Sequence, residues 1–165
     1  NSYVKCSGFE QCKLMAIDSV LDKDLIKNIK WYYWLNNNTL VSHAGITNQL
    51  AEKYKAPKGL KAFKKWLFKK ELEANEALKQ GRPHWLFMAG VARWGNQAFG
   101  GITWCDWTLE FDPIEGINQI VGHTPANKVR TESGKNTFNY CIDTHLEWYM
   151  IYEGKIKLKQ YKYVK

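Results

Sequence analysis

Two stretches of the sequence share one pattern, Thr39-Leu40-Val41-Ser42-His43-Ala44-Gly45 and Ile120-Val121-Gly122-His123-Thr124-Pro125. In each, a short apolar run leads to a histidine, and turn-forming residues follow it. A buried strand fixes the backbone and the chain then turns away, which presents the imidazole at the mouth of a sheet. Imidazole is the commonest metal ligand, so the pair predicts a shared metal bound by His43 and His123. Taken alone, either histidine could instead be a hydrogen-bonded core or loop residue.

The surrounding sequence alternates between helical and strand-like patterns. We expect an amphipathic helix over 18–34 with Asp18 as its N-cap, a short helix over 46–54, and a long helix over 60–80 that ends at Gly81. Residues 81–107, rich in Gly and Trp, predict a loop region over a pocket. Strands are expected at 119–121, 129–131, 138–143, 148–152 and 155–158. Helices first and antiparallel strands later predict an α+β fold.

The composition is that of a globular domain. The chain has 165 residues, 45% of them hydrophobic and 15% aromatic, which is enough to fill one core. No run of 18 apolar residues and no intact leader is present, so we expect neither a membrane span nor a signal peptide. The four cysteines lack Cys-x-x-Cys spacing, which favours buried, reduced thiols of a cytoplasmic protein. A zinc site or a Cys6–Cys12 disulfide is the alternative.

The formal net charge of +8 raises the question of a nucleic-acid partner. The lysines concentrate in 53–70, opposite the apolar face of the long predicted helix, and again in 155–165. Lysines opposite such a face usually form a solvated surface. They could also steer phosphorylated substrates or complement an acidic partner. Nucleic acid is disfavoured, because no interleaving of aromatic residues with glycine accompanies the charge.

Four segments in order resemble the calcineurin-like metallophosphoesterases over residues 38–155. Besides the two histidine motifs, Gly100-Gly101-Ile102-Thr103-Trp104-Cys105-Asp106-Trp107 is similar to the family's apolar Trp-x-Asp segment, and Asn139-Tyr140-Cys141-Ile142-Asp143-Thr144 resembles its late Ile-Asp-Thr strand. The nearest likeness is to the bacterial and phage phosphoprotein-phosphatase branch, which includes diadenosine tetraphosphate hydrolases. The family's opening motifs, Gly-Asp-x-His-Gly, Gly-Asp-x-x-Asp-Arg-Gly and Gly-Asn-His-Asp/Glu, do not occur here.

This resemblance implies a fold and a chemistry. Residues 1–165 would be the C-terminal portion of one α/β metallophosphoesterase domain, part of a four-layer α/β/β/α sandwich. His43 and His123 would ligate the same metal of a two-metal centre, most often Mn²⁺, which hydrolyses phosphate esters with an activated hydroxide. The bridging Asp and the Asn ligand would come from the missing N-terminal half as a partner. We therefore expect this chain alone to bind Mn²⁺ weakly and to turn over little, in the cytoplasm of a bacterium or a phage-infected cell.

Two further residues are candidates within the same resemblance. Arg93 lies where the family often places an arginine, and its planar fork would bind a phosphate bidentately. The alternative is an exposed arginine stacked on Trp94. Asp143 would orient a ligand histidine, or would be a structural turn residue. His145 replaces the family's usual Gly after Asp-Thr, which puts close functional transfer in doubt.

Two readings outside hydrolysis remain open. One is a non-catalytic remnant that serves as a structural or binding module, for example in a phage particle. The other is a basic nucleic-acid-binding domain, whose binding would fall steeply with salt. The choice between phosphoprotein, nucleotide and dinucleotide substrates rests on loops that vary within the fold.

Overall fold

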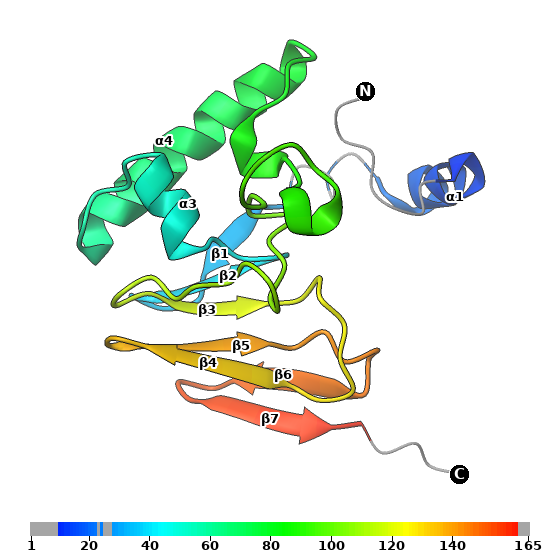
Figure 1. The fold of residues 1–165 in the computed structure, drawn as a ribbon. Helices are drawn as coiled ribbons and strands as arrows, with labels where there is room; N and C mark the ends of the chain where they lie inside the picture. The colour runs from blue at the N-terminus through cyan, green and yellow to red at the C-terminus, as the bar shows by residue number, and fades with distance from the viewer. Residues whose placement is uncertain (1–9, 23, 25–27, 162–165) are drawn as a thin grey trace.

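A computed structural model describes residues 10–22, 24 and 28–161, and within them the chain forms a mixed α+β fold with three helices and two sheets (Figure 1). The predicted α+β class is confirmed. The helices are α1 (Gln11–Val20), α3 (Asn48–Lys53) and α4 (Leu60–Lys79), with 3₁₀ turns η1 (Trp85–Phe87) and η2 (Val91–Arg93). The strands are β1 (Tyr32–Trp34), β2 (Thr39–Ser42), β3 (Asn118–Val121), β4 (Arg130–Gly134), β5 (Thr137–Cys141), β6 (Trp148–Tyr152) and β7 (Ile156–Gln160).

The larger sheet has three parallel strands at its centre. Its order is β1-β2-β3-β5-β4, in which β2 runs parallel to β3 and β3 runs parallel to β5. The two edge strands, β1 and β4, pair antiparallel with their neighbours. The register aligns Val41 with Ile120 and Ile120 with Tyr140, so the C-terminal ends of the three central strands lie next to one another. β6 and β7 form a separate antiparallel hairpin.

Helices α3 and α4 cover one face of this sheet, beside β1, β2 and β3 (Figure 1). Successive strand residues point to opposite faces, so Leu40 of β2 faces the helices and packs against Phe63 and Leu67 of α4. The Trp31 indole N–H donates to the Asn75 side-chain oxygen at 2.9 Å, which ties the start of β1 to α4. Other members of this core are Ile46, Leu50, Ala51, Ala74, Leu86, Phe87, Ile102, Ile114 and Ile117.

A buried amide, Gln119, fixes the chain that leaves β2. Its side-chain carbonyl accepts from the Ile46 N–H at 2.9 Å, and its side-chain NH₂ donates to the Ile46 carbonyl at 2.8 Å. The Gln119 backbone N–H donates to the Asn139 side chain at 2.8 Å, which extends the network to β5. Buried polar groups are costly unless they are paired, and here the pairing holds the backbone just beyond His43.

The sequence patterns predict most elements, with two errors. The later strands were expected to be antiparallel, which holds for β4 with β5 and for β6 with β7, but β3 pairs parallel with both β2 and β5. The expected helix over 18–34 is wrong in its bounds: Asp18 lies inside α1, which ends at Val20, Asp24 and Asn28 are helical, and Tyr32–Trp34 form β1. Three consecutive aromatic residues favour a pleated surface, and β1 finds a strand partner in β2. The apolar position Leu25 of that expected helix lies outside the described residues. The predicted helices over 46–54 and 60–80 correspond to α3 and α4, and the predicted strands correspond to β3 to β7.

Helix α1 differs from the other helices because none of its residues is buried. It lies apart from the sheet and from α3 and α4 (Figure 1). Across the described part of the chain, no helix combines the length and the apolarity that a membrane crossing requires. Cys105 and Cys141 are buried free thiols, as expected, whereas Cys12 is exposed, contrary to the expectation of buried thiols. Cys6 lies outside the described residues.

Replacement of Gln119 should destabilise the fold strongly. Gln119→Leu keeps the approximate size of the side chain but leaves the Ile46 N–H and C=O buried without partners, so we expect a loss of about 2–4 kcal/mol in the free energy of unfolding. Guanidinium denaturation measures this loss. Gln49→Leu on the exposed surface of α3 is the matched control and should change stability by less than about 0.5 kcal/mol. Equal losses in the two variants would contradict the role of the buried amide.

Candidate metal-ligating histidine site

Three chemistry-bearing residues follow the three central parallel strands. His43 comes directly after β2, His123 comes two residues after β3 ends at Val121, and Asp143 comes two residues after β5 ends at Cys141. The Gly122 N–H donates to the His43 carbonyl at 2.8 Å, which continues the pairing of β2 with β3 to the histidine itself. A side chain at Gly122 would lie 3.7 Å from the Asp143 Cβ. The sheet therefore places all three residues at the C-terminal ends of its parallel strands, as the sequence motifs predict for the two histidines.

The two imidazoles are in direct contact. His43 Nε2 lies 2.9 Å from His123 Nδ1, and the ring planes meet at 63°. A hydrogen bond between the rings has this separation when one nitrogen carries the proton. Two imidazole nitrogens bound to one metal at roughly 2.0–2.1 Å would stand about 2.8–3.4 Å apart. The same arrangement of nitrogen atoms therefore suits either a hydrogen-bonded pair or a shared divalent metal.

His123 is held in an unusual conformation. Its φ of 68° lies in the left-handed region, which residues other than glycine adopt at a cost of about 1–3 kcal/mol. The far ring nitrogen, Nε2, is buried and finds no hydrogen-bond partner in the described part of the chain. The Trp104 ring meets the imidazole edge to face, with ring centroids 5.5 Å apart. Backbone strain and an orphaned ring nitrogen on one residue are typical of a functional position.

Both histidines are shifted toward the neutral form. Burial lowers the pKa of His123 to about 4, and the nearby His43 and Arg93 add to this shift, while Asp106 and Asp143 oppose it. Burial also lowers the pKa of His43, against the opposing charge of Asp143. Near pH 7 each ring therefore offers an unprotonated nitrogen, which is the form that binds metals. The expected role of Asp143 in orienting a ligand histidine stays a prediction, although its charge acts on both rings.

Arg93 is anchored beside the histidines. It lies at the end of η2, where its Nε forms an ion pair with the Asp106 carboxylate at 2.8 Å. Its Nη2 donates to the Thr124 hydroxyl at 3.1 Å, one residue after His123. Trp94 is 94% exposed, and no cation–π contact joins it to Arg93 in the described structure. The guanidinium is therefore oriented by a carboxylate and a hydroxyl rather than by stacking on Trp94.

Sequence reasoning did not single out two residues of this site, Asp106 and Thr124. Asp106 fixes Arg93, and its other carboxylate oxygen accepts from the N–H groups of Thr108 and Leu109. The Thr124 hydroxyl accepts from Arg93 and also from the Trp107 N–H. Arg130 donates to the Thr124 carbonyl and holds the loop after His123. The Trp-x-Asp and His-Thr-Pro segments carry two of these residues, but nothing local in the sequence pairs them with Arg93.

The described residues do not form a complete metal site by themselves. No group of three or more His, Cys, Asp and Glu side chains within them is arranged to hold a metal ion. His84 does not belong to this site, because its Nδ1 accepts from the Leu86 N–H and caps η1. His145 is exposed on the turn after Asp143. Among the described residues, the two converging imidazoles are therefore candidate metal donors without a third such side chain grouped with them.

Acid should destabilise the fold through His123. Its pKa is 6.5 when unperturbed and about 4 in the folded chain, so between these values the unfolded chain binds more protons. The contribution of His123 to stability is therefore complete above pH 6.5 and is lost as the pH falls toward 4. An NMR titration of the ring signals measures the pKa, and His43→Ala should raise it by removing a neighbouring ring. A midpoint near 6.5 in the parent chain would refute this assignment.

The ion pair between Arg93 and Asp106 should couple η2 to the turn at 106–109. In Asp106→Asn the amide oxygen still accepts from Thr108 and Leu109, so the substitution removes mainly the charge. A double-mutant cycle with Arg93→Met should give an interaction free energy of about 1–2 kcal/mol in the unfolding equilibrium. Strictly additive losses in the two single variants would show that the contact contributes no coupling.

Comparison with known proteins identifies no relative of this chain. The chain matches no protein-family model, no curated protein and no solved structure. The functional proposal therefore depends on the residues themselves: two neutral imidazoles in contact after the C-terminal ends of two parallel strands, with an anchored arginine beside them.

Proposed function

We propose that this chain contributes two histidine ligands and a phosphate-binding arginine to a metal-dependent phosphoesterase of the calcineurin-like class. The observation that carries the proposal is the contact between His43 Nε2 and His123 Nδ1, 2.9 Å apart at the ends of two adjacent parallel strands. The resemblance of the motifs supports the same assignment. In this reading the described fold is one portion of the layered α/β sandwich of that class.

The histidine pair suits a divalent metal in geometry and in protonation. The spacing matches two nitrogen ligands of one ion, and the low pKa values keep both rings neutral. A metal site generally takes three or four protein ligands, so further ligands would come from polypeptide outside the described residues. A bound pair of divalent ions, most often Mn²⁺ in this class, supplies an activated water and neutralises the charge on the phosphoryl group.

The chain's own residues would bind and orient the phosphate ester. Arg93 is held by Asp106 on one side and Thr124 on the other, which leaves the rest of its planar fork for the phosphoryl oxygens. This anchoring reduces the rotamer entropy lost on binding. Asp143 acts on both rings and would stabilise their orientation.

A groove beside His43 supports a polypeptide partner for this site. Its volume is about 470 Å³, and Ile29, Trp31, Tyr33 and Val41 give it a largely apolar lining next to His43. The side chains of Ile29 and Tyr33 are each more than 60% exposed. A second segment with an apolar face would pack here and bring carboxylate ligands to the histidine pair. That segment would correspond to the N-terminal portion of the class.

Mn²⁺ binding tests the proposal directly. The parent chain should bind Mn²⁺ weakly, and His43→Ala or His123→Asn should each reduce the affinity by about tenfold or more, which corresponds to about 1.4 kcal/mol. Asn tolerates the left-handed backbone at position 123, so this variant removes the ring with little added strain. Isothermal titration calorimetry gives the affinities, and paramagnetic broadening identifies the affected ring signals.

His145→Asn is the matched control. It removes an exposed imidazole from a residue whose backbone φ, like that of His123, lies in the left-handed region. This variant should bind Mn²⁺ as the parent does. Equal affinities in all three variants and the parent would refute the metal site and leave the pair as a hydrogen-bonded structural contact. In that case the non-catalytic binding module would become the better reading.

A further inference from the structure

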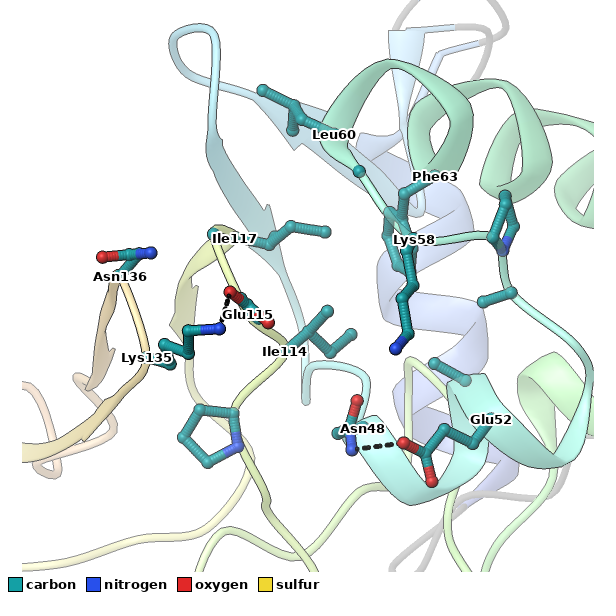
Figure 2. Close-up of a pocket in the computed structure, with 16 residues that line it drawn as sticks. Asn48, Glu52, Lys58, Leu60, Phe63, Ile114, Glu115, Ile117, Lys135 and Asn136 are labelled. Carbon is teal, nitrogen blue, oxygen red and sulfur yellow. Dashed lines mark hydrogen bonds and ion pairs between the residues drawn. The ribbon is translucent and has the colours of Figure 1, made fainter.

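A pocket with a volume of about 640 Å³ lies between α3, the start of α4 and the segment 113–117 (Figure 2). The charged residues of its lining are two acidic and two basic ones: Glu52, Glu115, Lys58 and Lys135. Phe63 and Ile117 also line it, but each is only 2% exposed and belongs to the core. The pocket therefore favours neither sign of ligand charge and offers little apolar surface. The outer side of α4, which begins beside this pocket, has the opposite character.

Two exposed apolar residues interrupt the amphipathic pattern of α4. The buried residues that mark the inner side of the helix are Phe63, Leu67, Ala74 and Ala77. At 3.6 residues per turn, Phe68 and Leu72 lie on the opposite side, which faces solvent at the outside of the fold (Figure 1). They are 56% and 53% exposed, whereas every other large apolar residue of α4 is buried or half-buried. Because they are four positions apart, their side chains are neighbours and form a small apolar patch.

Lysines border this patch on the side of the helix N-terminus. Lys61, Lys65 and Lys69 are exposed, and the described part of the chain gives them no ion-pair partner. Lys64 is engaged elsewhere, because its ammonium lies 4.4 Å from the centre of the Trp34 ring. The outer face of α4 is defined here by five residues: Lys61, Lys65, Phe68, Lys69 and Leu72.

The exposed carboxylates of α4 follow this face toward the C-terminus of the helix. Glu73 forms an ion pair with Lys70 at 2.7 Å, and Glu76 lies 3.7 Å from Lys79. No acidic residue occupies the first turn. The helix as a whole carries six lysines against three glutamates, so positive charge is left uncompensated at the outer face. The net charge of +8 on the chain adds to the attraction for an anionic partner.

We propose that the outer face of α4 binds an acidic amphipathic helix of another protein. The apolar residues of that helix pack on Phe68 and Leu72, and its carboxylates pair with the three lysines of the face. Helices present apolar side chains at positions i and i+4, which is the spacing of Phe68 and Leu72, so the two apolar ridges can pack side by side. This surface lies on the far side of α4 from the sheet, and the proposal does not depend on the phosphoesterase function.

Charge complementarity favours this partner over two others. A second copy of the chain would present the same excess of lysines, and like charges across an interface oppose association. A nucleic acid would gain little from Leu72, which has no ring for base stacking, and Glu73 and Glu76 would repel its phosphates next to the patch. An acidic helix satisfies both the lysines and the apolar pair.

The probe is a synthetic alanine-rich helical peptide that carries two leucines at positions i and i+4 flanked by glutamates. Two-dimensional ¹H–¹⁵N NMR titration of the full chain gives the affinity and maps the perturbed residues. We expect perturbations over 61–72, and an affinity at least about tenfold lower when alanines replace the leucines or glutamines replace the glutamates. Phe68→Ala should lower the affinity by about tenfold. Phe138→Ala, which removes an exposed phenylalanine from β5, is the matched control and should not.

Charge reversal tests the role of the lysines. The double variant Lys65→Glu, Lys69→Glu should lose binding of the acidic peptide and gain binding of a peptide in which lysines replace the glutamates. Lys155→Glu, Lys159→Glu changes the net charge equally at exposed positions in and beside β7 and should leave the affinity within about twofold, because salt screens distant charges. Circular dichroism verifies that each variant is folded.

Equal losses in the two charge-reversed variants would reduce the interaction to general charge attraction and overturn the proposal. Equal losses in Phe68→Ala and Phe138→Ala, or perturbations confined to other parts of the chain, would overturn it as well. A single-stranded oligonucleotide that binds the outer face of α4 more tightly than the peptide would identify nucleic acid as the partner instead.

Discussion

The hydrogen bonds between β2 and β3 join segments that lie about eighty positions apart, and both histidines owe their positions to this pairing. The ladder continues past the strands, because the Gly122 N–H donates to the His43 carbonyl. The Gln119 side chain forms two hydrogen bonds with the Ile46 backbone, which fixes the turn after His43 against the sheet. The contact between the rings is thus a product of sheet register rather than of the loops alone.

Electrostatics around the site follow from burial more than from charge. Desolvation is the largest influence on both histidines, and the carboxylates of Asp106 and Asp143 only partly offset it at His123. The Asp106 carboxylate forms an ion pair with the Arg93 guanidinium, in which Oδ2 lies 2.8 Å from Nε. Under the proposed function, the neutral ring pair would bind a divalent cation and the neighbouring guanidinium would contact the phosphate bound to it.

Sequence patterns were most informative where a local signal and the tertiary context agree. Helix α4 follows from its apolar period, and the strand before each histidine follows from the apolar run and the turn after it. The expected helix over 18–34 was wrong at its C-terminal end, because an aromatic run such as Tyr32–Trp34 also fits a strand once β2 is available as a partner. The anchoring of Arg93 could not be read, since its partners Asp106 and Thr124 lie 13 and 31 positions away and no periodicity links them.

The long separation between β2 and β3 also bears on how the chain acquires this site. Closing a loop of about eighty residues has to be offset by contacts that form only once the strands meet, whereas α4 can form from neighbours three and four positions apart. We therefore expect the contact between His43 and His123 to form late in folding, after the local contacts of α4.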